Sequence, residues 1–301
     1  MKKYTGETIL LSITLIWGGT FVIVKAALQD VSPVLFVTIR FSLAALLLLP
    51  FVFKVIKKMD RKVITGGILL GLIYFLEFVA QIVGLKYTTA TKSGFITGSF
   101  ILFTPVFQLL LEKKKPGGGN LLGVLFVISG LIFLSSSGTS IFEIFREIGS
   151  GFNIGDFLTL LSAAALGAYI VCLDIISRKQ DYLLLAFMQM GVTAVCGVIL
   201  TVFLSAANLE PAEFSFNNNV LLAVLYTGIL ATALATTLQT KYQKFVTPTK
   251  AGIIFSFEPV FAAAFAYFII NERISYLGFL GGALIFAGLL VTELFNEIKP
   301  G

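Results

Sequence analysis

Apolar residues are grouped along this chain into ten long segments, each bounded by charged or turn-forming residues. A helix needs ~20 apolar residues to cross the ~30 Å hydrocarbon core of a bilayer, and every segment has about that length. The pattern predicts an all-α membrane protein with ten transmembrane helices, at about 8–28, 33–53, 64–85, 91–111, 119–136, 154–176, 183–206, 219–241, 249–270 and 276–296.

The composition excludes several classes of protein. The chain has 301 residues, of which 57% are hydrophobic and 13% charged, and its mean hydropathy is +0.96. Soluble domains carry about 25% charged residues, so a soluble enzyme, a disordered tail and a disulfide-stapled secreted module are excluded. The apolar run after Met1-Lys2-Lys3 is too long for the core of a signal peptide, so we expect it to be retained as the first helix.

Basic residues gather in alternate connections between the predicted helices. The opposite connections hold only Lys86, Arg146 and Arg273. Because Lys and Arg are enriched in cytoplasmic loops, this asymmetry predicts a plasma-membrane protein with both termini in the cytoplasm. The net charge of +6 is then a signal of topology, and no nucleic-acid partner is expected. The predicted cytoplasmic residues are Lys2, Lys3, Lys54, Lys57, Lys58, Arg61, Lys62, Lys113, Lys114, Lys115, Arg178, Lys179, Lys241, Lys244 and Lys299.

The sequence also repeats itself. Residues 85–94 align with 243–252, and the same offset pairs Gln81 with Gln239 and Gly123 with Gly281. A slightly smaller offset pairs Gly18 with Gly167 and Arg40 with Gln189. Each half then holds five helices, and an odd number forces the second half to enter the membrane from the opposite side. We expect two inverted-topology repeats, 1–140 and 150–298, an arrangement typical of secondary transporters.

Short motifs in both halves resemble a known family. They are Ile16-Trp17-Gly18-Gly19-Thr20-Phe21, Pro33-Val34-Leu35-Phe36 with Arg40-Phe41, Phe257-Glu258-Pro259-Val260, Asn271-Glu272-Arg273-Ile274, and Gly281 with Gly288. Together they resemble the drug/metabolite transporter superfamily, specifically proteins with two EamA-type domains. The resemblance implies ten helices, a substrate cavity between the halves, and export of amino acids, metabolites or drugs by alternating access.

The first half departs from the motif of the second. It carries Phe103-Thr104-Pro105-Val106, four residues later relative to Gly94 than Pro259 is to Gly252. Pro105 and Pro259 are therefore not repeat partners, and we assign both a structural role.

Ionisable and amide side chains inside apolar helices are the main site candidates, because each is costly at membrane depth without a partner or a watery cavity. Glu258 precedes a helix-breaking proline, and could couple a proton or cation, contact a substrate amine, or hold the kink. Glu77 and Gln81 share a helix face, and Gln239 is the repeat partner of Gln81. These three either line the substrate pathway or join helices by hydrogen bonds.

Other candidates flank them. Arg40 either pairs with a carboxylate, extends toward the membrane surface or contacts substrate. Trp17 and Tyr169 are either walls of the cavity or packing residues, and Thr97 and Ser99 form a small polar patch assigned to the substrate pathway.

Several chemistries are missing from the sequence. There is no histidine, and Cys172 and Cys196 lie in apolar segments as free thiols. No phosphate-binding loop is present, which argues against an ATP-driven pump. Asp156 and Asp174 would lie about 27 Å apart along one helix, too far to form a catalytic dyad. We therefore expect no enzyme, cofactor or metal.

The prediction is a secondary active exporter of small organic solutes that works by alternating access through a central cavity. Its partners would be the solute, the lipid bilayer and, if transport is coupled, a proton or ion. A passive exchanger or facilitator stays open, as does a membrane-embedded lipid-modifying enzyme or scaffold. The sequence makes no prediction of oligomeric state.

Overall fold

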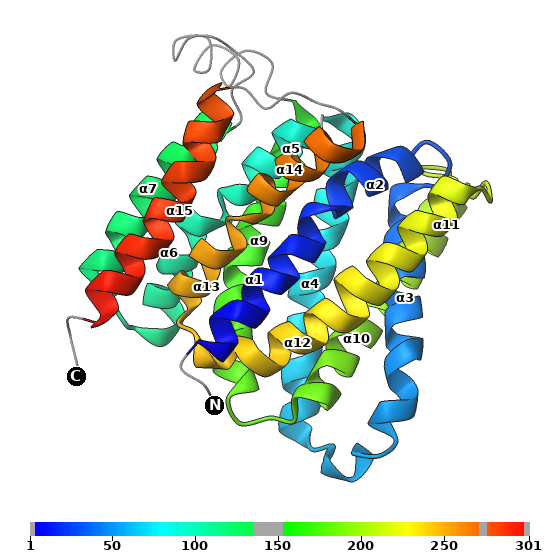
Figure 1. The fold of residues 1–301 in the computed structure, drawn as a ribbon. Coiled ribbons are helices and arrows are strands. Elements are labelled where there is room, and N and C mark those ends of the chain that lie inside the picture. The colour runs from blue at the N-terminus through cyan, green and yellow to red at the C-terminus, as the bar shows by residue number, and fades with distance from the viewer. Residues whose placement is uncertain (1–3, 89, 135–152, 271–275, 298–301) are drawn as a thin grey trace.

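The structure is a computed structural model that describes residues 4–88, 90–134, 153–270 and 276–297. This part of the chain is almost entirely helical, as predicted, and an isolated bridge between Val31 and Phe214 is its only β-type pairing. Figure 1 shows the helices packed into one bundle. The elements are α1 (Thr5–Gly18), α2 (Thr20–Ala27), α3 (Pro33–Val52), η1 (Ile56–Lys58), α4 (Arg61–Tyr87), α5 (Ala90–Gly98), α6 (Phe100–Glu112), α7 (Gly118–Leu134), α9 (Ile154–Ser177), α10 (Tyr182–Ala206), α11 (Asn218–Leu225), η2 (Tyr226–Leu234), α12 (Ala235–Tyr242), η3 (Gln243–Phe245), α13 (Pro248–Phe255), α14 (Glu258–Ile270) and α15 (Tyr276–Glu297).

Six helical stretches in the described chain are long and apolar enough to cross a membrane. Three shorter apolar helices, Ile96–Glu112, Gly118–Phe133 and Phe279–Thr292, coincide with predicted segments. Large apolar side chains cover the outside of the bundle, including Phe203 and Phe279, which are 60% and 74% exposed. An apolar surface of this extent is suited to lipid rather than water. The six stretches are Thr5–Ala27, Pro33–Val52, Arg61–Tyr87, Ile154–Ser177, Tyr182–Ala206 and Asn218–Phe245.

Three of the predicted helices are interrupted near their middle, and the first of them, predicted at 8–28, divides into α1 and α2 at Gly19. The chain between Ala90 and Glu112 divides into α5 and α6 at Ser99, and the chain from Pro248 to Ile270 divides into α13 and α14 at Ser256 and Phe257. Such breaks leave backbone groups without helical partners, and membrane proteins tolerate them where other protein groups cover them.

Helices α7 and α15 pack directly on each other, backbone to backbone. A Cβ atom added to Gly123 would lie 2.9 Å from the carbonyl oxygen of Gly288, and one added to Gly130 would lie 2.7 Å from that of Gly281. The contacts run in opposite order along the two helices, so the helices are antiparallel (Figure 1). Gly123 and Gly281 are 158 residues apart, as are Gly130 and Gly288. The two contacts are therefore related to each other by the sequence repeat.

The same inverted relation governs α1 and α9. A Cβ atom on Gly18 of α1 would lie 2.6 Å from the Cβ of Phe261 in α14, and one on Gly167 of α9 would lie 2.8 Å from the Cβ of Phe103 in α6. Phe103 and Phe261 are again 158 residues apart. The first helix of each half therefore packs against the broken helix of the other half, and the two repeats interlock.

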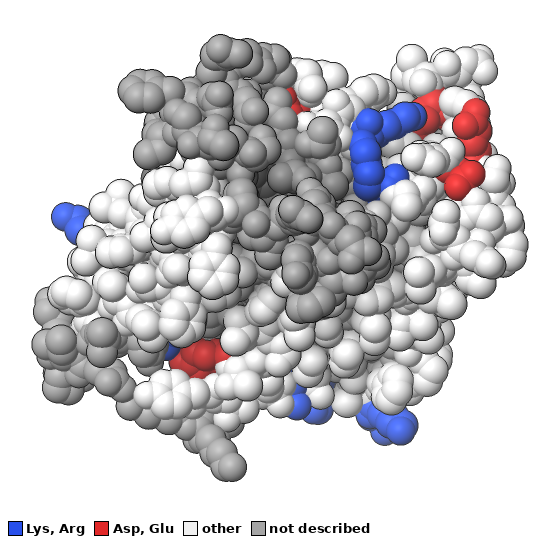
Figure 2. All heavy atoms as spheres, turned by 45° about the horizontal axis from the view of Figure 1, so that its top comes forward, with Lys and Arg blue, Asp and Glu red and all other residues white. Residues whose placement is uncertain are grey.

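Two faces of the bundle are named here by their elements. The lower face is where α1 begins and α15 ends, and the upper face is where α2 ends and α3 begins (Figure 1). In Figure 2, with the upper face turned forward, acidic and basic residues lie close together at the upper right, and most of the remaining described surface is uncharged. This distribution is the one expected for a protein with a lipid-facing belt.

Candidate functional site

A cluster of three buried charged residues lies inside the bundle, where the two halves meet. Arg40 from α3 and Glu77 from α4 belong to the first half, and Glu258 from α14 belongs to the second. Their exposed fractions are 2%, 2% and 9%. Arg40 interacts electrostatically with both carboxylates. Among the described residues, however, no ion pair within 4.0 Å joins it to either one, and we call these three residues the central cluster.

Arg40 is held away from the carboxylates by other groups. Its Nε donates a hydrogen bond to Thr232 Oγ1 at 2.6 Å. The guanidinium carbon lies 4.4 Å from the centre of the Phe78 ring and 5.5 Å from that of Phe41. Cations are attracted to aromatic faces at such distances, and more strongly in a site without water. Neither extension to the membrane surface nor a direct ion pair describes this arginine.

Glu77 has an unsatisfied oxygen. Its Oε2 is buried without a hydrogen-bond partner, and so is the hydroxyl oxygen of Ser162 in α9. The Ser162 hydroxyl lies near the Glu77 carboxyl group, where a small movement would let it donate a hydrogen bond. A buried polar atom that lacks a partner is costly. Ser162 is therefore the neighbouring donor available to Glu77.

Glu258 is the first residue of α14, directly after the break. Pro259 follows it, and since proline has no N–H, the carbonyl of Phe255 loses its helical donor. A carboxylate in the first turn of a helix is favoured by the partial positive charge of the helix N-terminus. The break thus positions an acidic side chain at the junction of the halves.

Aromatic rings surround the cluster on α4 and α9. Tyr169 stacks on Tyr74, with ring centres 4.4 Å apart and an angle of 10° between the planes. The Tyr169 hydroxyl donates to Gln189 Oε1 at 2.9 Å, and the Tyr74 hydroxyl is 2.9 Å from Thr236 Oγ1. These contacts join α4, α9, α10 and α12. Tyr169 therefore has both a packing role and a place beside the charged groups.

The acceptors for Trp17 and Arg40 both belong to η2, a π-helical segment. Trp17 Nε1 donates to the carbonyl of Ala231 at 2.9 Å, and the next residue, Thr232, accepts the bond from Arg40. The indole ring lies 5.3 Å from that of Phe255, at the end of α13. A π-helix displaces backbone carbonyls from their usual donors and is frequent at functional sites. Sequence analysis did not predict this segment.

The predicted pair of amides does not meet at the cluster. Gln81 is half-buried on α4, one turn beyond Glu77. Gln239 is buried and donates to Gln243 Oε1 at 2.9 Å, and Gln243 in turn donates to the carbonyl of Ile170 at 2.7 Å. The Gln239 oxygen has no partner. Gln239 thus contributes to a hydrogen-bonded junction between α12 and α9.

The remaining candidates lie on the broken helices. Thr97 is buried, and its hydroxyl lacks a partner, whereas Ser99 lies at the break and donates to the carbonyl of Ile96 at 2.6 Å. Pro259 is the second residue of α14, but Pro105 lies inside α6, six residues after the break. The structure therefore places only Pro259 at a break.

Sequence analysis missed several residues of the site. Tyr74 precedes Glu77 by three residues on α4, and Ser162 precedes Tyr169 by seven on α9. Both spacings bring side chains to one face of a helix, so helical periodicity could have identified them. Thr232 had no comparable signal.

Contacts between the halves close both faces. On the upper face the backbone of Ser32 donates to the carbonyl of Glu213 at 3.1 Å, beside the bridge between Val31 and Phe214. On the lower face Lys250 of α13 forms an ion pair of 2.8 Å with Glu7 of α1. The central cluster is consequently buried from both sides in this conformation.

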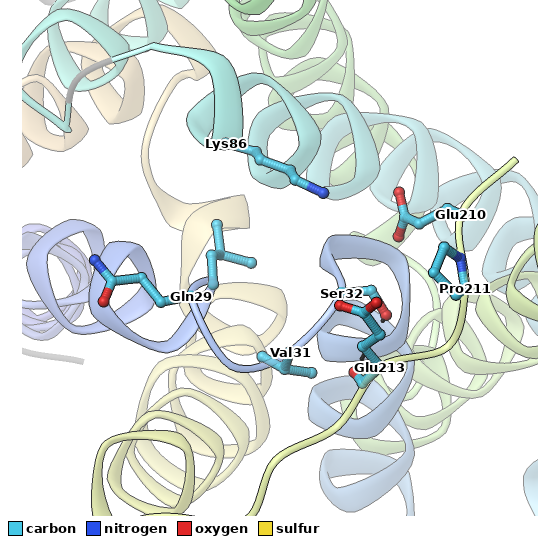
Figure 3. A pocket seen from close by; sticks show the side chains of 8 residues that line it. Gln29, Val31, Ser32, Lys86, Glu210, Pro211 and Glu213 are labelled. Atoms are coloured by element: carbon cyan, nitrogen blue, oxygen red, sulfur yellow. Dashed lines mark hydrogen bonds between the residues drawn. The ribbon is translucent and has the colours of Figure 1, made fainter.

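A small cavity of about 160 Å³ lies beside the contacts of the upper face. Lys86 from the end of α4 points into it, opposite Glu210 and Glu213 from the connection between α10 and α11 (Figure 3). Among the described residues, no group of three or more His, Cys, Asp or Glu could hold a metal ion there or elsewhere.

Comparison with known proteins agrees with this architecture. The sequence model of the EamA-like transporter family matches residues 4–136 and 153–294. An uncharacterized transporter of Archaeoglobus fulgidus is 34% identical over 98% of this chain and 87% of its own length. The uncharacterized transporter YoaV of Bacillus subtilis is 22% identical over 96% of this chain and 97% of its own. One protein of known crystal structure superposes over the full length of both chains with a TM-score of 0.79 at 17% identity, a likeness of fold alone.

Proposed function

This chain belongs to the EamA-like transporter family, and on that basis we propose that it exports small organic solutes across a plasma membrane by secondary active transport. The candidate solutes are amino acids, metabolites or drugs. In this proposal the repeats 1–140 and 150–298 move relative to each other, and a cavity between them opens to one face at a time.

The proposed topology has ten transmembrane helices with the lower face in the cytoplasm. The start of α1 and the end of α15 lie on that face, which fits an even number of crossings (Figure 1). The basic residues of the described loops, such as Lys57 and Lys58 of η1, support the same orientation.

The central cluster is the observation that carries the proposal. It combines Arg40 and Glu77 of one repeat with Glu258 of the other, between halves that are related by inversion. Residues of both halves meet at the substrate site in transporters built from inverted repeats. Separation of the halves would break the contact of Arg40 with Thr232 and admit water and solute.

We assign proton coupling to Glu258 or Glu77. Moving one charge across a membrane potential of ~100 mV is worth ~2.3 kcal/mol, enough for roughly fiftyfold accumulation of a solute. Trp17, Tyr169, Thr97, Ser99, Gln81 and Gln239 complete the proposed pathway.

Flux into proteoliposomes with and without an imposed pH gradient tests this function. The wild-type protein should respond to the gradient, and Glu258→Gln should lose that response. Glu112→Gln is the matched control, because Glu112 ends α6 at the lower face, where it pairs with Lys114 and Arg178. Unchanged transport and unchanged pH dependence in Glu258→Gln would remove this carboxylate from the mechanism. Counterflow that ignores every ion gradient would identify a passive exchanger instead.

A further inference from the structure

We infer that residues 207–217, the connection between α10 and α11, form a releasable strap that holds the upper face closed. The inference rests on the proposed function, in which a cavity between the halves opens to one face at a time. It follows from the backbone pairing of this connection, from its position and from a difference in length between the repeats. We call residues 207–217 the strap.

The strap pairs with the connection between α2 and α3 as a short antiparallel ribbon. The backbone N–H of Ser32 donates to the carbonyl of Glu213 at 3.1 Å, and the N–H of Ser215 donates to the carbonyl of Asp30 at 2.8 Å. The two bonds enclose one residue of each connection. A two-stranded pairing is marginally stable in water, and this one is very short, so the strap can open and close.

Side chains add to this pairing. Glu210 Oε1 accepts a hydrogen bond from the backbone N–H of Val34 at 3.4 Å. This N–H lies in the first turn of α3, which begins at Pro33, and therefore has no acceptor within its own helix. Lys86 at the end of α4 points into the cavity beside the strap, opposite Glu210 and Glu213, and attracts both carboxylates (Figure 3). The strap is thus bound to the start of α3 and attracted to the end of α4.

The strap joins at the surface the same elements that Arg40 joins inside the bundle. Arg40 of α3 donates to Thr232 of η2, and α11 leads from the strap into η2. The two elements also pack closely, because a Cβ atom added to Gly228 of η2 would lie 2.7 Å from Leu43 Cδ2 of α3. Helix α3 belongs to the first half and η2 to the second. Separation of these elements toward the upper face therefore requires release of the strap.

The repeat is longer at the strap than at its counterpart. Arg40 and Gln189 are 149 residues apart, whereas Gln81 and Gln239 are 158 apart, so the second half has nine additional residues between these positions. Helix α10 has 25 residues against 20 in α3, and the strap is longer than the corresponding connection, 53–60. The additional residues therefore extend the chain at the upper face alone.

The corresponding connections of the lower face are joined differently. Asp181 is the counterpart of Ser32, 149 residues later, and it forms an ion pair of 3.1 Å with Lys58 of the connection 53–60. In the described chain no backbone hydrogen bond joins these two connections. The Lys58 side chain is 65% exposed, and exposed ion pairs contribute little to stability. The connections therefore close the upper face more firmly than the lower one, and release of the strap is a step in opening toward the upper face.

A proline substitution tests whether the pairing keeps the upper face closed. Ser32 has a φ angle of −68°, which proline adopts without strain. Ser32→Pro removes the N–H that binds Glu213, and Ser32→Ala, which keeps this N–H, is the matched control. The reporter is Val37→Cys in a Cys172→Ser/Cys196→Ser background. Val37 is buried on α3, three residues before Arg40 and on the same helix face.

Modification of the reporter by a hydrophilic maleimide would be measured in purified full-length protein. Modification should be at least fivefold faster with Ser32→Pro than with Ser32→Ala. A second reporter, Leu10→Cys, separates local opening from loss of fold, because Leu10 is buried on α1 near the lower face and its modification should not become faster. Equal rates at Val37→Cys for the two Ser32 variants, or an equal acceleration at both reporters, would overturn the inference.

A reversible cross-link tests whether the strap must open during transport. Val31 and Phe214 lie opposite each other between the two backbone bonds. Such pairs have Cα atoms ~4.5 Å apart, within the range that a disulfide requires. In the same cysteine-free background, oxidation of Val31→Cys/Phe214→Cys should lower flux into proteoliposomes at least tenfold, and a reductant should restore it. Each single variant, oxidised in the same way, is a control and should keep its flux.

The two assays separate failure of the inference from failure of the proposed function. Full flux in the completely cross-linked protein would overturn the strap and leave the proposed function intact. A wild-type protein without flux under any gradient would refute the proposed function, and the maleimide assay would still decide whether the strap closes the upper face.

Discussion

The breaks at Ser99 and at Ser256 and Phe257 lie at equivalent positions of the two repeats but differ in chemistry. Helix α6 begins at Phe100 and α14 begins at Glu258, residues that are 158 positions apart, as the repeat requires. The first half therefore places a buried apolar ring where the second half places a carboxylate. The break is a feature of the repeat, whereas the charge belongs to one half alone. An inverted repeat can thus keep a symmetric framework for movement and still carry a single, asymmetric binding site.

Proline does not explain the shared break. Pro259 adjoins the break in the second half, but Pro105 lies well inside α6. Both breaks are instead followed, four residues later, by a close contact with a glycine of the opposite half: Phe103 with Gly167, and Phe261 with Gly18. The common feature is the packing of the halves against each other.

The largest expected effect comes from making the two breaks chemically alike. Phe100→Glu places a carboxylate at the equivalent position of the first half, where the native side chain is 1% exposed. Burial of an unpaired charge at membrane depth costs ~3 kcal/mol, so the free energy of unfolding should fall by about that amount. Unfolding in mixed micelles would measure it. Phe100→Leu is the control, and equal losses for the two variants would contradict the comparison.

A smaller loss of stability is expected from substitutions at the two equivalent glycine contacts between the halves. Gly18→Ala and Gly167→Ala each add a Cβ that would lie 2.6 and 2.8 Å from a neighbouring Cβ atom. Overpacking of this kind costs about 1–3 kcal/mol, and the two losses in unfolding free energy should be similar. Gly191 is the control, because no atom outside its own helix lies within 4 Å of an added Cβ there. Gly191→Ala should leave stability unchanged or raise it by up to ~1 kcal/mol. Unequal losses at Gly18 and Gly167 would show that the interlock is not symmetric.

The ion pair of Lys250, near the start of α13, is expected to contribute less to the free energy of unfolding. Lys250 and Glu7 form an ion pair with side-chain exposed fractions of 11% and 22%. Lys250→Met should lower the free energy of unfolding by about 1 kcal/mol, close to the upper limit for exposed pairs. The ion pair of Lys58 with Asp181 is more exposed, so Lys58→Met should change stability by less than ~0.5 kcal/mol. The same unfolding assay at low and high salt measures both, and a larger loss for Lys58→Met would contradict the role of the lower-face contact.

The smallest effect concerns the proline itself. Pro259 occupies the second position of α14, where its fixed φ angle suits the first turn of a helix. Pro259→Ala should cost about 0.5–1 kcal/mol through greater freedom of the unfolded chain, and the break should persist. Proton-coupled flux should stay within twofold of wild type. A transport defect as large as that of Glu258→Gln would show that proline, and not packing, sets the break.

The distribution of apolar and charged residues along the chain predicted the helices and two residues of the central cluster. Segment length and apolar composition predicted the helices that the structure describes, because a chain in lipid must satisfy its backbone groups within each helix. Glu77 and Glu258 were identified because a carboxylate is conspicuous in an apolar segment. Pro105 and Pro259 were both assigned a structural role, but only Pro259 adjoins a break, and the break before α6 lies six residues before Pro105. Near this break Phe103 contacts Gly167 of a different helix, a contact between residues far apart in the sequence that hydropathy does not predict.

The partners of Arg40 were also beyond sequence analysis. Thr232 is 192 residues away and accepts the bond from within a π-helix, whose extra residue per turn leaves no mark in the hydropathy. The positions of Lys2, Lys3, Arg146, Arg273 and Lys299 lie outside the described residues, and so do residues 137–152 of the connection predicted at 137–153 between the halves. Their predicted roles therefore stay predictions.

The contact between α7 and α15 is formed by two equivalent pairs of glycines, one pair from each repeat. Gly123 contacts Gly288 and Gly130 contacts Gly281. The two helices therefore use equivalent residues to contact each other. Such an isologous contact requires no second, complementary sequence. Two copies of a single five-helix chain, inserted in opposite orientations, could make it as well as two fused halves do. The α7–α15 contact is thus compatible with descent from an antiparallel homodimer, and in a fused chain the two halves can differ, as Phe100 and Glu258 do.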